Sequence, residues 1–178
     1  MDNPRSDGSC GYWALCYGLG RYDDDKNGAF YIRQSLFNHL EKCEAFYKRI
    51  DWFEYDETWN RLLGGSSKIP RSGWFKAPEC AQLAADVLHT PIAIFSSTQE
   101  DDATLYLPLL YRSGKDVVGY FPQRPIILVF VGDNHFVNVD YKTDHSGMIK
   151  WPSTAFAKKL FKKLKIKPWF SGNNWFPP

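Results

Sequence analysis

Asp7-Gly8-Ser9-Cys10-Gly11-Tyr12-Trp13-Ala14-Leu15 is the stretch in which a polar turn passes into a helix. Residues 1–9 are polar and rich in turn formers, a composition typical of loops. Apolar side chains then recur at helical spacing, at Tyr12, Leu15, Cys16 and Leu19. The pattern predicts that Cys10 lies at or just before the N-terminus of an amphipathic helix.

A cysteine in that position is suited to nucleophilic chemistry. The free N–H groups and the dipole of a helix N-terminus favour negative charge, so they lower the pKa of a thiol. Gly8 and Gly11 allow the backbone to approach a substrate closely. The N–H groups of Cys10 and of the preceding turn can then form an oxyanion hole.

A nucleophilic thiol also needs a base, and His135 is the best candidate among four histidines. It begins a predicted strand directly after a turn, so its ring can be exposed at the mouth of a sheet. His39 and His89 lie in predicted helices, and His145 lies in a polar loop. A cysteine far upstream of a histidine is the arrangement expected of a nucleophile and base that meet only in the fold.

The rest of the chain predicts helices first and strands later. Helical patterns cover residues 30–50, with a break, and 79–88, with Pro78 in the first turn. Loops are expected at 64–67, 70–73 and 97–104. Strands are expected at 92–95, 105–111, 126–131 and 135–141, the second of them at an edge because of Pro108. This order favours an α+β fold with helices packed on a small sheet.

Composition narrows the class of protein. The chain has 178 residues, 44% hydrophobic and 17% aromatic, which suits one well-packed domain and excludes a disordered chain. A net charge of +2 is too near neutral to indicate nucleic acid. No stretch is apolar enough to cross a bilayer, and the N-terminus has no signal core. We therefore expect a cytoplasmic protein without a transmembrane segment.

The four cysteines show no disulfide framework. They are scattered at Cys10, Cys16, Cys43 and Cys80, which favours a reducing, intracellular setting. A zinc site remains an alternative, but it would need a chance convergence of ligands drawn from Cys16, Cys43, Cys80, His39 and His89. We expect no metal and no organic cofactor.

A basic, aromatic extension follows from about residue 152. Ser153 or Thr154 can cap a helix that Pro168 ends, with an apolar stripe of Phe156, Leu160, Phe161 and Leu164. The opposite face carries Lys158, Lys159, Lys162, Lys163, Lys165 and Lys167. A solvated face is the favoured interpretation, and contact with an acidic protein, RNA or anionic lipid is the alternative. The Trp-rich tail is expected to fold back onto one domain that spans residues 1–178.

Three blocks of sequence together resemble the ovarian-tumour (OTU) family of cysteine proteases. The stretch 7–15 looks like the Asp-Gly-x-Cys box that opens the family's domain. Asn134-His135-Phe136-Val137-Asn138-Val139 looks like its C-terminal His-aromatic strand. Between them, Trp74, Glu79, Leu83-Ala84 and Pro91-Ile92 are similar to the family's middle block, although Phe75 and Cys80 replace its Gly and Leu.

The resemblance implies a papain-like OTU fold with helices around a small central β-sheet. It implies Cys10 as nucleophile and His135 as base. It also implies ubiquitin or a ubiquitin-like protein as partner, a monomer, and no nucleic acid. Asp7, with Gly8 and Ser9, would hold the oxyanion loop; the alternative is an Asx-turn without a catalytic part. Trp74 would lie near the channel for the substrate tail, or else be a core residue.

The third catalytic residue departs from the family's common pattern. Many members carry Asp or Asn two residues after the histidine, where this chain has Val137. Asn138 should face the other way because side chains alternate along a strand. The OTU-like papain-like protease of arteriviruses instead has Asn-Pro-Pro-x-Asp-Gly-x-Cys-Gly, in which the first Asn orients the histidine. This chain reads Asn3-Pro4-Arg5-Ser6-Asp7-Gly8-Ser9-Cys10-Gly11, without that enzyme's zinc-finger cysteines.

Asn3 is therefore predicted to orient His135. The alternative is that Asn3-Pro4 only starts a turn. The function implied is a deubiquitinating cysteine protease that hydrolyses peptide or isopeptide bonds after the C-terminal glycine of ubiquitin or a relative. Alternatives are a viral polyprotein protease of the same fold, acting in the host cytoplasm, a catalytically silent ubiquitin-binding module, or an RNA- or membrane-binding module that uses the Lys-rich helix.

Overall fold

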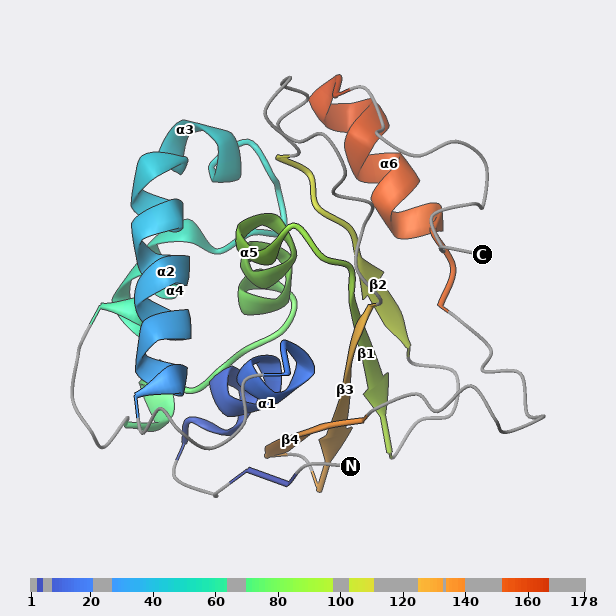
Figure 1. Ribbon diagram of the computed structural model, residues 1–178. Coiled ribbons are helices and arrows are strands. Elements are labelled where there is room, and N and C mark those ends of the chain that lie inside the picture. The colour runs from blue at the N-terminus through green and yellow to red at the C-terminus, as the bar shows by residue number, and fades with distance from the viewer. Residues whose placement is uncertain are drawn as a thin grey trace.

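The computed structural model describes residues 3–4, 8–20, 27–63, 70–97, 103–110, 125–132, 134–139 and 152–166. Helices dominate the first half of the chain and strands the second (Figure 1). The helices are α1 (Cys10–Gly18), α2 (Gly28–Lys42), α3 (Glu44–Tyr47), α4 (Tyr55–Leu62), the 3-10 helix η1 (Arg71–Gly73), α5 (Glu79–Leu88) and α6 (Ala155–Leu164). The strands are β1 (Ile92–Ser96), β2 (Thr104–Tyr106), β3 (Ile126–Val131) and β4 (His135–Asn138).

The four strands form one mixed sheet in the order β2-β1-β3-β4. β1 and β3 are parallel, with Ile92 opposite Ile126, and both outer pairs are antiparallel. β3 and β4 form a hairpin in which Val131 pairs with His135. Gly132 lies in the turn with φ of 56°, a left-handed conformation that favours glycine. The hairpin thus places the histidine at the first position of the last strand, beside a turn.

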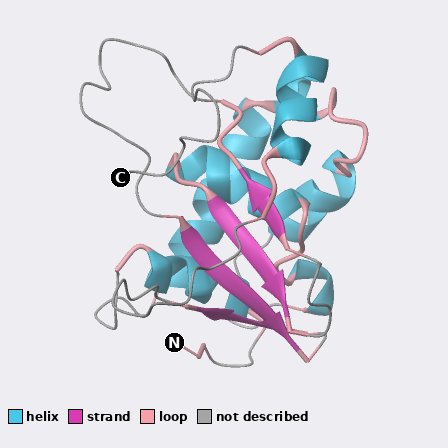
Figure 2. Cartoon of the chain, turned by 90° about the vertical axis from the view of Figure 1, so that its right-hand side faces the viewer, coloured by secondary structure: helices cyan, strands magenta, loops and turns pink. Residues whose placement is uncertain are grey.

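Helices cover both faces of this sheet (Figures 1 and 2). α1 packs against β3 and β4, and α5 packs against β1 and β2, while α2 and α4 form an outer layer behind them. α6 lies on the other side of the sheet, where it contacts β2. The fold is therefore α+β, with helices around a small central sheet, as the sequence predicts.

The core lies between the sheet and the first helical layer. Its fully buried side chains include Tyr12, Leu15, Leu36, Leu83 and Leu128, drawn from α1, α2, α5 and β3. α1 approaches the sheet closely because Gly18 has no side chain: a Cβ there would lie 2.4 Å from Cγ2 of Ile126. This close contact fixes the helix that carries Cys10 against the strands that carry His135.

Most elements match the sequence prediction, with four differences. α4 was not predicted, and residues 71–73 form a 3-10 turn where a loop was expected. Pro78 precedes α5 instead of occupying its first turn, and His89 follows α5 in a left-handed conformation (φ 49°) instead of lying within it. β2 is short and lies at the sheet edge, as the proline predicted. Residues 64–67 and the tail from 167 lie outside the described residues.

The C-terminal helix has the predicted amphipathic pattern. Its stripe of Leu160, Phe161 and Leu164 is buried, whereas its lysines are exposed, one of them paired with Asp51. The described part of the chain contains no helix with the length and apolarity needed to cross a membrane.

Candidate active site

Cys10 is the first residue of α1, where unpaired backbone N–H groups meet the positive end of the helix dipole. The N–H of Trp13 donates to the carbonyl of Ser9 at 2.9 Å, which closes the first turn. Gly8 has φ of 85°, so the turn before the helix requires a residue that tolerates a left-handed conformation. Asp7, the predicted support of the oxyanion loop, lies outside the described residues.

The segment after η1 is held directly over the start of α1. A Cβ on Gly11 would lie 2.4 Å from Cβ of Phe75, so only glycine allows the two backbones to approach this closely. The buried hydroxyl of Tyr12 donates to the carbonyl of Gly73 at 3.2 Å. These two contacts place Trp74 and Phe75 beside Cys10.

His135 is joined to the N-terminal residues by a side-chain hydrogen bond. Its Nε2 lies 2.7 Å from Oδ1 of Asn3, across 132 positions of sequence. An amide oxygen can only accept, so Nε2 carries a proton, and in a neutral ring Nδ1 is then the nitrogen with the lone pair. The imidazole is thereby held in the tautomer that a general base requires, with Nδ1 free of that bond.

The other polar residue on β4 cannot serve this purpose. Asn138 is buried, and its Nδ2 donates to the carbonyl of Ile127 at 3.1 Å. Val137, at the position where many OTU enzymes carry Asp or Asn, is buried and apolar. Within the described residues, Asn3 is the polar side chain that contacts the His135 ring.

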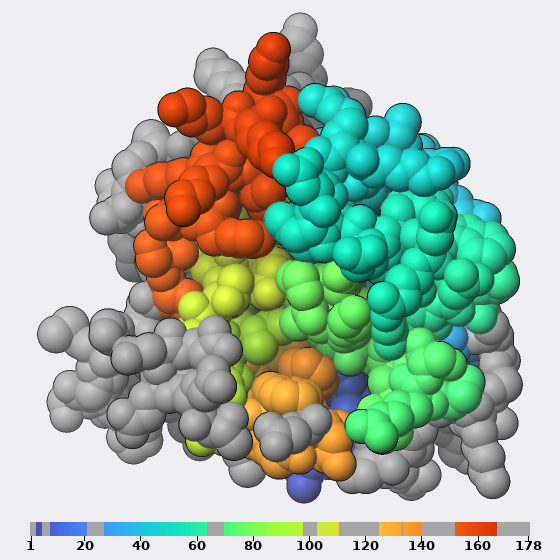
Figure 3. All heavy atoms as spheres, turned by 180° about the vertical axis from the view of Figure 1, so that it is seen from behind, coloured from blue at the N-terminus to red at the C-terminus, as the bar shows by residue number. Residues whose placement is uncertain are grey.

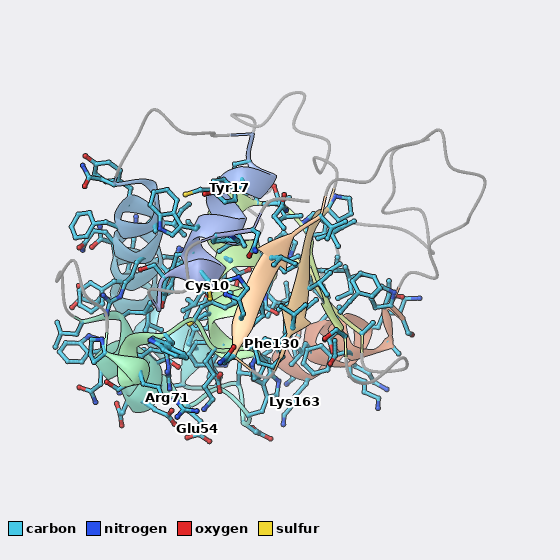
Figure 4. All side chains as sticks on the ribbon, turned by 90° about the horizontal axis from the view of Figure 1, so that it is seen from below. Cys10, Tyr17, Glu54, Arg71, Phe130 and Lys163 are labelled. Carbon is cyan, nitrogen blue, oxygen red and sulfur yellow. The ribbon has the colours of Figure 1, made fainter. Side chains whose placement is uncertain are left out.

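Cys10 contributes to the wall of a small cavity of about 190 Å³. Trp74, Phe75, Phe130 and Phe136 provide aromatic walls, and the side chain of Asn134 lies next to them. Figure 4 shows Cys10 at the end of α1 beside the sheet, with Phe130 on the neighbouring strand and Arg71 on the helical side. The predicted channel residue Trp74 therefore lines the same cavity as the predicted nucleophile.

The remaining wall of this cavity, called here the cysteine cavity, is cationic. Arg61, Arg71 and Lys76 line it, and no carboxylate of the described residues does. Arg61 is the best fixed of the three: its Nη1 donates to the carbonyl of Trp74 at 3.2 Å and its Nη2 pairs with Glu57 at 2.5 Å. Cations close to a cysteine favour its thiolate over its thiol.

A larger cavity of about 980 Å³ adjoins the cysteine cavity. The two share Phe75, Lys76, Phe130 and Phe136 in their walls, so they lie next to each other and are here together called the cleft. The larger part is mainly apolar and reaches α6 and the edge of the sheet at β2. Figure 3 shows the face on which α6 in red, β2 in yellow and the β3–β4 hairpin in orange come together. The cleft has room for several residues of an extended chain.

Cys10 is itself buried, but it lines the cysteine cavity and the other three cysteines do not. Cys16 and Cys80 are buried in the core, and Cys43 is partly exposed between α2 and α3. Burial raises the pKa of Cys80 to about 11, although a hydrogen bond from the backbone of Lys76, the charge of Arg61 and a hydrogen bond with Tyr12 act against that rise. All four are free thiols.

This contrast predicts a selective reaction. With iodoacetamide at pH 7.5, we expect Cys10 to be alkylated at least tenfold faster than Cys16 and Cys80, because a thiol must ionise and be reached in order to react. Peptide mapping by mass spectrometry over a time course measures each site. If Cys16 or Cys80 were modified first in the folded protein, the helix N-terminus would not be activating Cys10.

The structure also bears on the alternative of a zinc site and on the other three histidines. Among the described residues, no three His, Cys, Asp or Glu side chains are grouped in a way that could hold a metal ion. His39 contacts the hydroxyl of Tyr47 at 3.0 Å and does not line the cysteine cavity. His89 lines a separate cavity near α6. His145 lies outside the described residues.

Sequence reasoning missed most of the cavity wall. Asn134 and Phe136 flank His135 and Phe75 follows Trp74, so proximity in sequence could have suggested them. Arg61 and Arg71 carried no such signal, because they come from a helix that was not predicted and from a turn read as a loop.

Neither protein-family models nor curated proteins give a match to this sequence. Among solved structures, the chain is similar to an OTU deubiquitinase from Wolbachia pipientis wMel. The superposition covers 82% of this chain and 90% of that chain, with a TM-score of 0.45 and 13% sequence identity. So loose an overlap does not identify the family, and the site is therefore interpreted from its own geometry.

Proposed function

We propose that this protein is a cysteine protease that removes ubiquitin or a ubiquitin-like modifier from its conjugates. The observation that carries the proposal is the pairing of His135 with Asn3 at 2.7 Å, in a fold that also places Cys10 at a helix N-terminus on a cleft. A cysteine, a histidine and an asparagine that orients the histidine are the parts of a papain-like catalytic triad.

The proposed reaction is acyl transfer in two steps. The Cys10 thiolate attacks the carbonyl carbon of the modifier's C-terminal glycine, and backbone N–H groups at the start of α1 stabilise the oxyanion. Nδ1 of His135 takes the proton of the Cys10 thiol before the attack and gives that proton to the departing lysine amine as the thioester forms. It then removes a proton from water, which attacks the thioester and releases the modifier with a free carboxylate.

The shape of the cysteine cavity supports a glycine substrate. Its aromatic walls at Trp74, Phe75 and Phe136 enclose about 190 Å³ beside the thiol, which has room for the glycine end of an extended tail. The adjoining larger part of the cleft offers apolar surface for the remainder of an extended tail.

A suicide probe tests this function directly. Ubiquitin that carries a C-terminal propargylamide should form a covalent adduct with the wild-type protein and not with Cys10→Ala. Cys43→Ala is the matched control, because it removes a thiol that lies outside the cleft and should leave the adduct unchanged. Intact mass measures the adduct, and digestion locates it.

The outcomes separate the candidate functions. An adduct on Cys10 supports the nucleophile and the substrate class together. Binding of ubiquitin without an adduct would instead indicate a silent binding module. If the protein reacted with probes made from ubiquitin-like modifiers but not with the ubiquitin probe, its substrate would be a ubiquitin-like modifier and not ubiquitin. If the protein neither bound nor reacted with any of these probes, that result would contradict the proposal.

Asn3→Ala tests the proposed triad. We expect kcat to fall by roughly 10- to 100-fold, because the histidine loses the bond that fixes its tautomer, with KM within about twofold of wild type. Asn3→Asp is the informative companion, since a carboxylate can still accept from Nε2 and should retain more activity than alanine. Hydrolysis of a ubiquitin fluorogenic ester or amide measures both. An unchanged kcat in Asn3→Ala would indicate a two-residue Cys–His dyad.

A further inference from the structure

Apart from favouring a thiolate, the cationic wall of the cysteine cavity has no part in the acyl-transfer steps described above. It is built from three separate segments: α4 supplies Arg61, η1 supplies Arg71, and the segment before α5 supplies Lys76. The side chain of Arg61 is only 11% exposed, so this charge is held within the protein and not displayed on a flexible stem. Three cations converge on a space of about 190 Å³ that also borders the nucleophile.

Only part of this charge is neutralised. Glu57 pairs with Lys76 at 3.2 Å and with Arg61 at 2.5 Å, and those pairs hold the pKa of the Glu57 carboxyl below its ordinary value. Arg71 stacks its guanidinium carbon 5.8 Å from the Trp74 ring centroid. In the described part of the chain, no carboxylate forms an ion pair with Arg71. Among the described residues, three cations and one carboxylate give this wall a net positive charge.

The proposed function restricts where a matching negative charge can come from. Glycine residues before the scissile bond have no side chains, so a charged side chain next to the bond belongs to the leaving group. Resting on that function, we propose that Arg71, with Arg61 and Lys76, forms a subsite for an acidic side chain within two residues of the site of cleavage on the leaving-group side. The subsite selects which conjugated proteins are cleaved.

The physical basis is attraction in a partly enclosed space. Opposite charges near a protein surface attract more strongly than in bulk water, and dilute salt screens them only in part. An acidic residue in the leaving group is therefore bound more tightly in the transition state than a neutral one, and a basic residue is repelled. Arg71 has the largest expected share, because its charge is not balanced by a carboxylate of the described residues.

Linear ubiquitin fusions measure this selectivity. Ubiquitin is followed by a short reporter peptide that begins with Glu-Glu, Ala-Ala or Lys-Lys. For the wild type at low ionic strength, we expect kcat/KM to be about tenfold higher for Glu-Glu than for Lys-Lys, with Ala-Ala between them. Arg71→Glu should remove or reverse that order, and Arg71→Gln should reduce it. Lys159→Glu is the matched control: it makes the same charge change on the exposed face of α6, outside the cleft, and should keep the order.

A second measurement reads the charge beside Cys10 without ubiquitin. Methanethiosulfonates react when the thiolate attacks the sulfenyl sulfur, which forms a mixed disulfide and releases methanesulfinate. The measured quantity is the rate with the anionic sulfonatoethyl reagent divided by the rate with the cationic trimethylammonioethyl reagent. We expect this ratio to be about tenfold higher for Cys10 than for a free thiol in solution. Arg71→Glu should lower this ratio by about tenfold, and circular dichroism checks that the variant is folded.

The two measurements distinguish failure of the subsite from failure of the proposed function. A reagent ratio equal to that of the free thiol, or one that Arg71→Glu leaves unchanged, overturns the subsite whether or not the fusions are cleaved. Cleavage at equal rates for Glu-Glu and Lys-Lys also overturns it. A ratio that favours the anion, together with no cleavage of any fusion, supports the anion site and counts against ubiquitin as the modifier.

Discussion

Cys10→Ala is expected to reduce hydrolysis of a ubiquitin conjugate by roughly 10⁴-fold or more, because the step in which the acyl group is transferred then has no nucleophile. The folded structure should survive, since the change removes one sulfur atom at the margin of the core, where Cys10 is 6% exposed. Turnover of a fluorogenic ubiquitin amide measures the first effect, and the thermal unfolding midpoint measures the second.

His135→Ala provides the matched comparison for this prediction. A nucleophile and its base act as a unit, so each single variant should lose about as much activity as the double variant. Losses that multiply in the double variant would show that the two side chains act independently. If Cys10→Ala still turned substrate over faster than the uncatalysed rate, Cys10 would not be the nucleophile.

Asp86→Ala is expected to lower the free energy of unfolding by roughly 3 kcal/mol or more. The Asp86 carboxyl is fully buried and accepts hydrogen bonds from the backbone N–H groups of Leu109 and Leu110, and from the side chains of Tyr47 and Gln82. Alanine would leave the N–H groups of Leu109 and Leu110 without this acceptor. The Gln82 side chain would keep its bond to the carbonyl of Leu107, and the Tyr47 hydroxyl its contact with His39. Urea unfolding measures the loss, and activity per folded molecule should stay unchanged because Asp86 lines a cavity that shares no residue with the cysteine cavity.

The same residue predicts a pH dependence of stability. Burial raises the pKa of Asp86 to about 6, although hydrogen bonds from Leu110, Tyr47, Leu109 and Gln82 lower it. The folded state therefore binds this proton more tightly than the unfolded chain, whose aspartates titrate near pH 4. The free energy of unfolding should fall as the pH rises from about 4 to about 6, by an amount on the order of 3 kcal/mol, and then level off.

Asp86→Asn is the control for this pH dependence. It has no titrating group, so its unfolding free energy should lack this part of the decline between pH 4 and pH 6. If the wild type instead became more stable than Asp86→Asn as the pH rose through that range, the four donors would outweigh burial and the carboxyl would be ionised in the folded protein.

Local patterns in the sequence predict the elements of the fold well. The apolar run at 126–131 and the alternation after His135 give β3 and β4, and the spacing after Cys10 gives α1. α4 was missed because Tyr55–Leu62 is short and strongly polar, and its stability comes from packing on α2 and η1. Local propensity carries little information where tertiary contacts decide.

Contacts between residues far apart in the sequence were harder to predict from the sequence. Strand order, and the parallel pairing of β1 with β3, depend on which surfaces meet in space. The proximity of Asn3 to His135 was predicted through a family resemblance, and their hydrogen bond fits that prediction, whereas a catalytic role for either residue stays a prediction. The cationic wall could not be predicted, because nothing in sequence links Arg61 to Cys10.

The bond between Asn3 and His135 also has a kinetic meaning. It joins residues 132 positions apart, so it can form only after the chain between them has closed a very long loop. Contacts of such sequence separation form late when they are not part of the folding nucleus. During refolding, the reactivity of Cys10 that depends on His135 should therefore appear with the slowest phase, after helical circular dichroism has recovered. The recovery of Cys10 reactivity would therefore report when folding is complete.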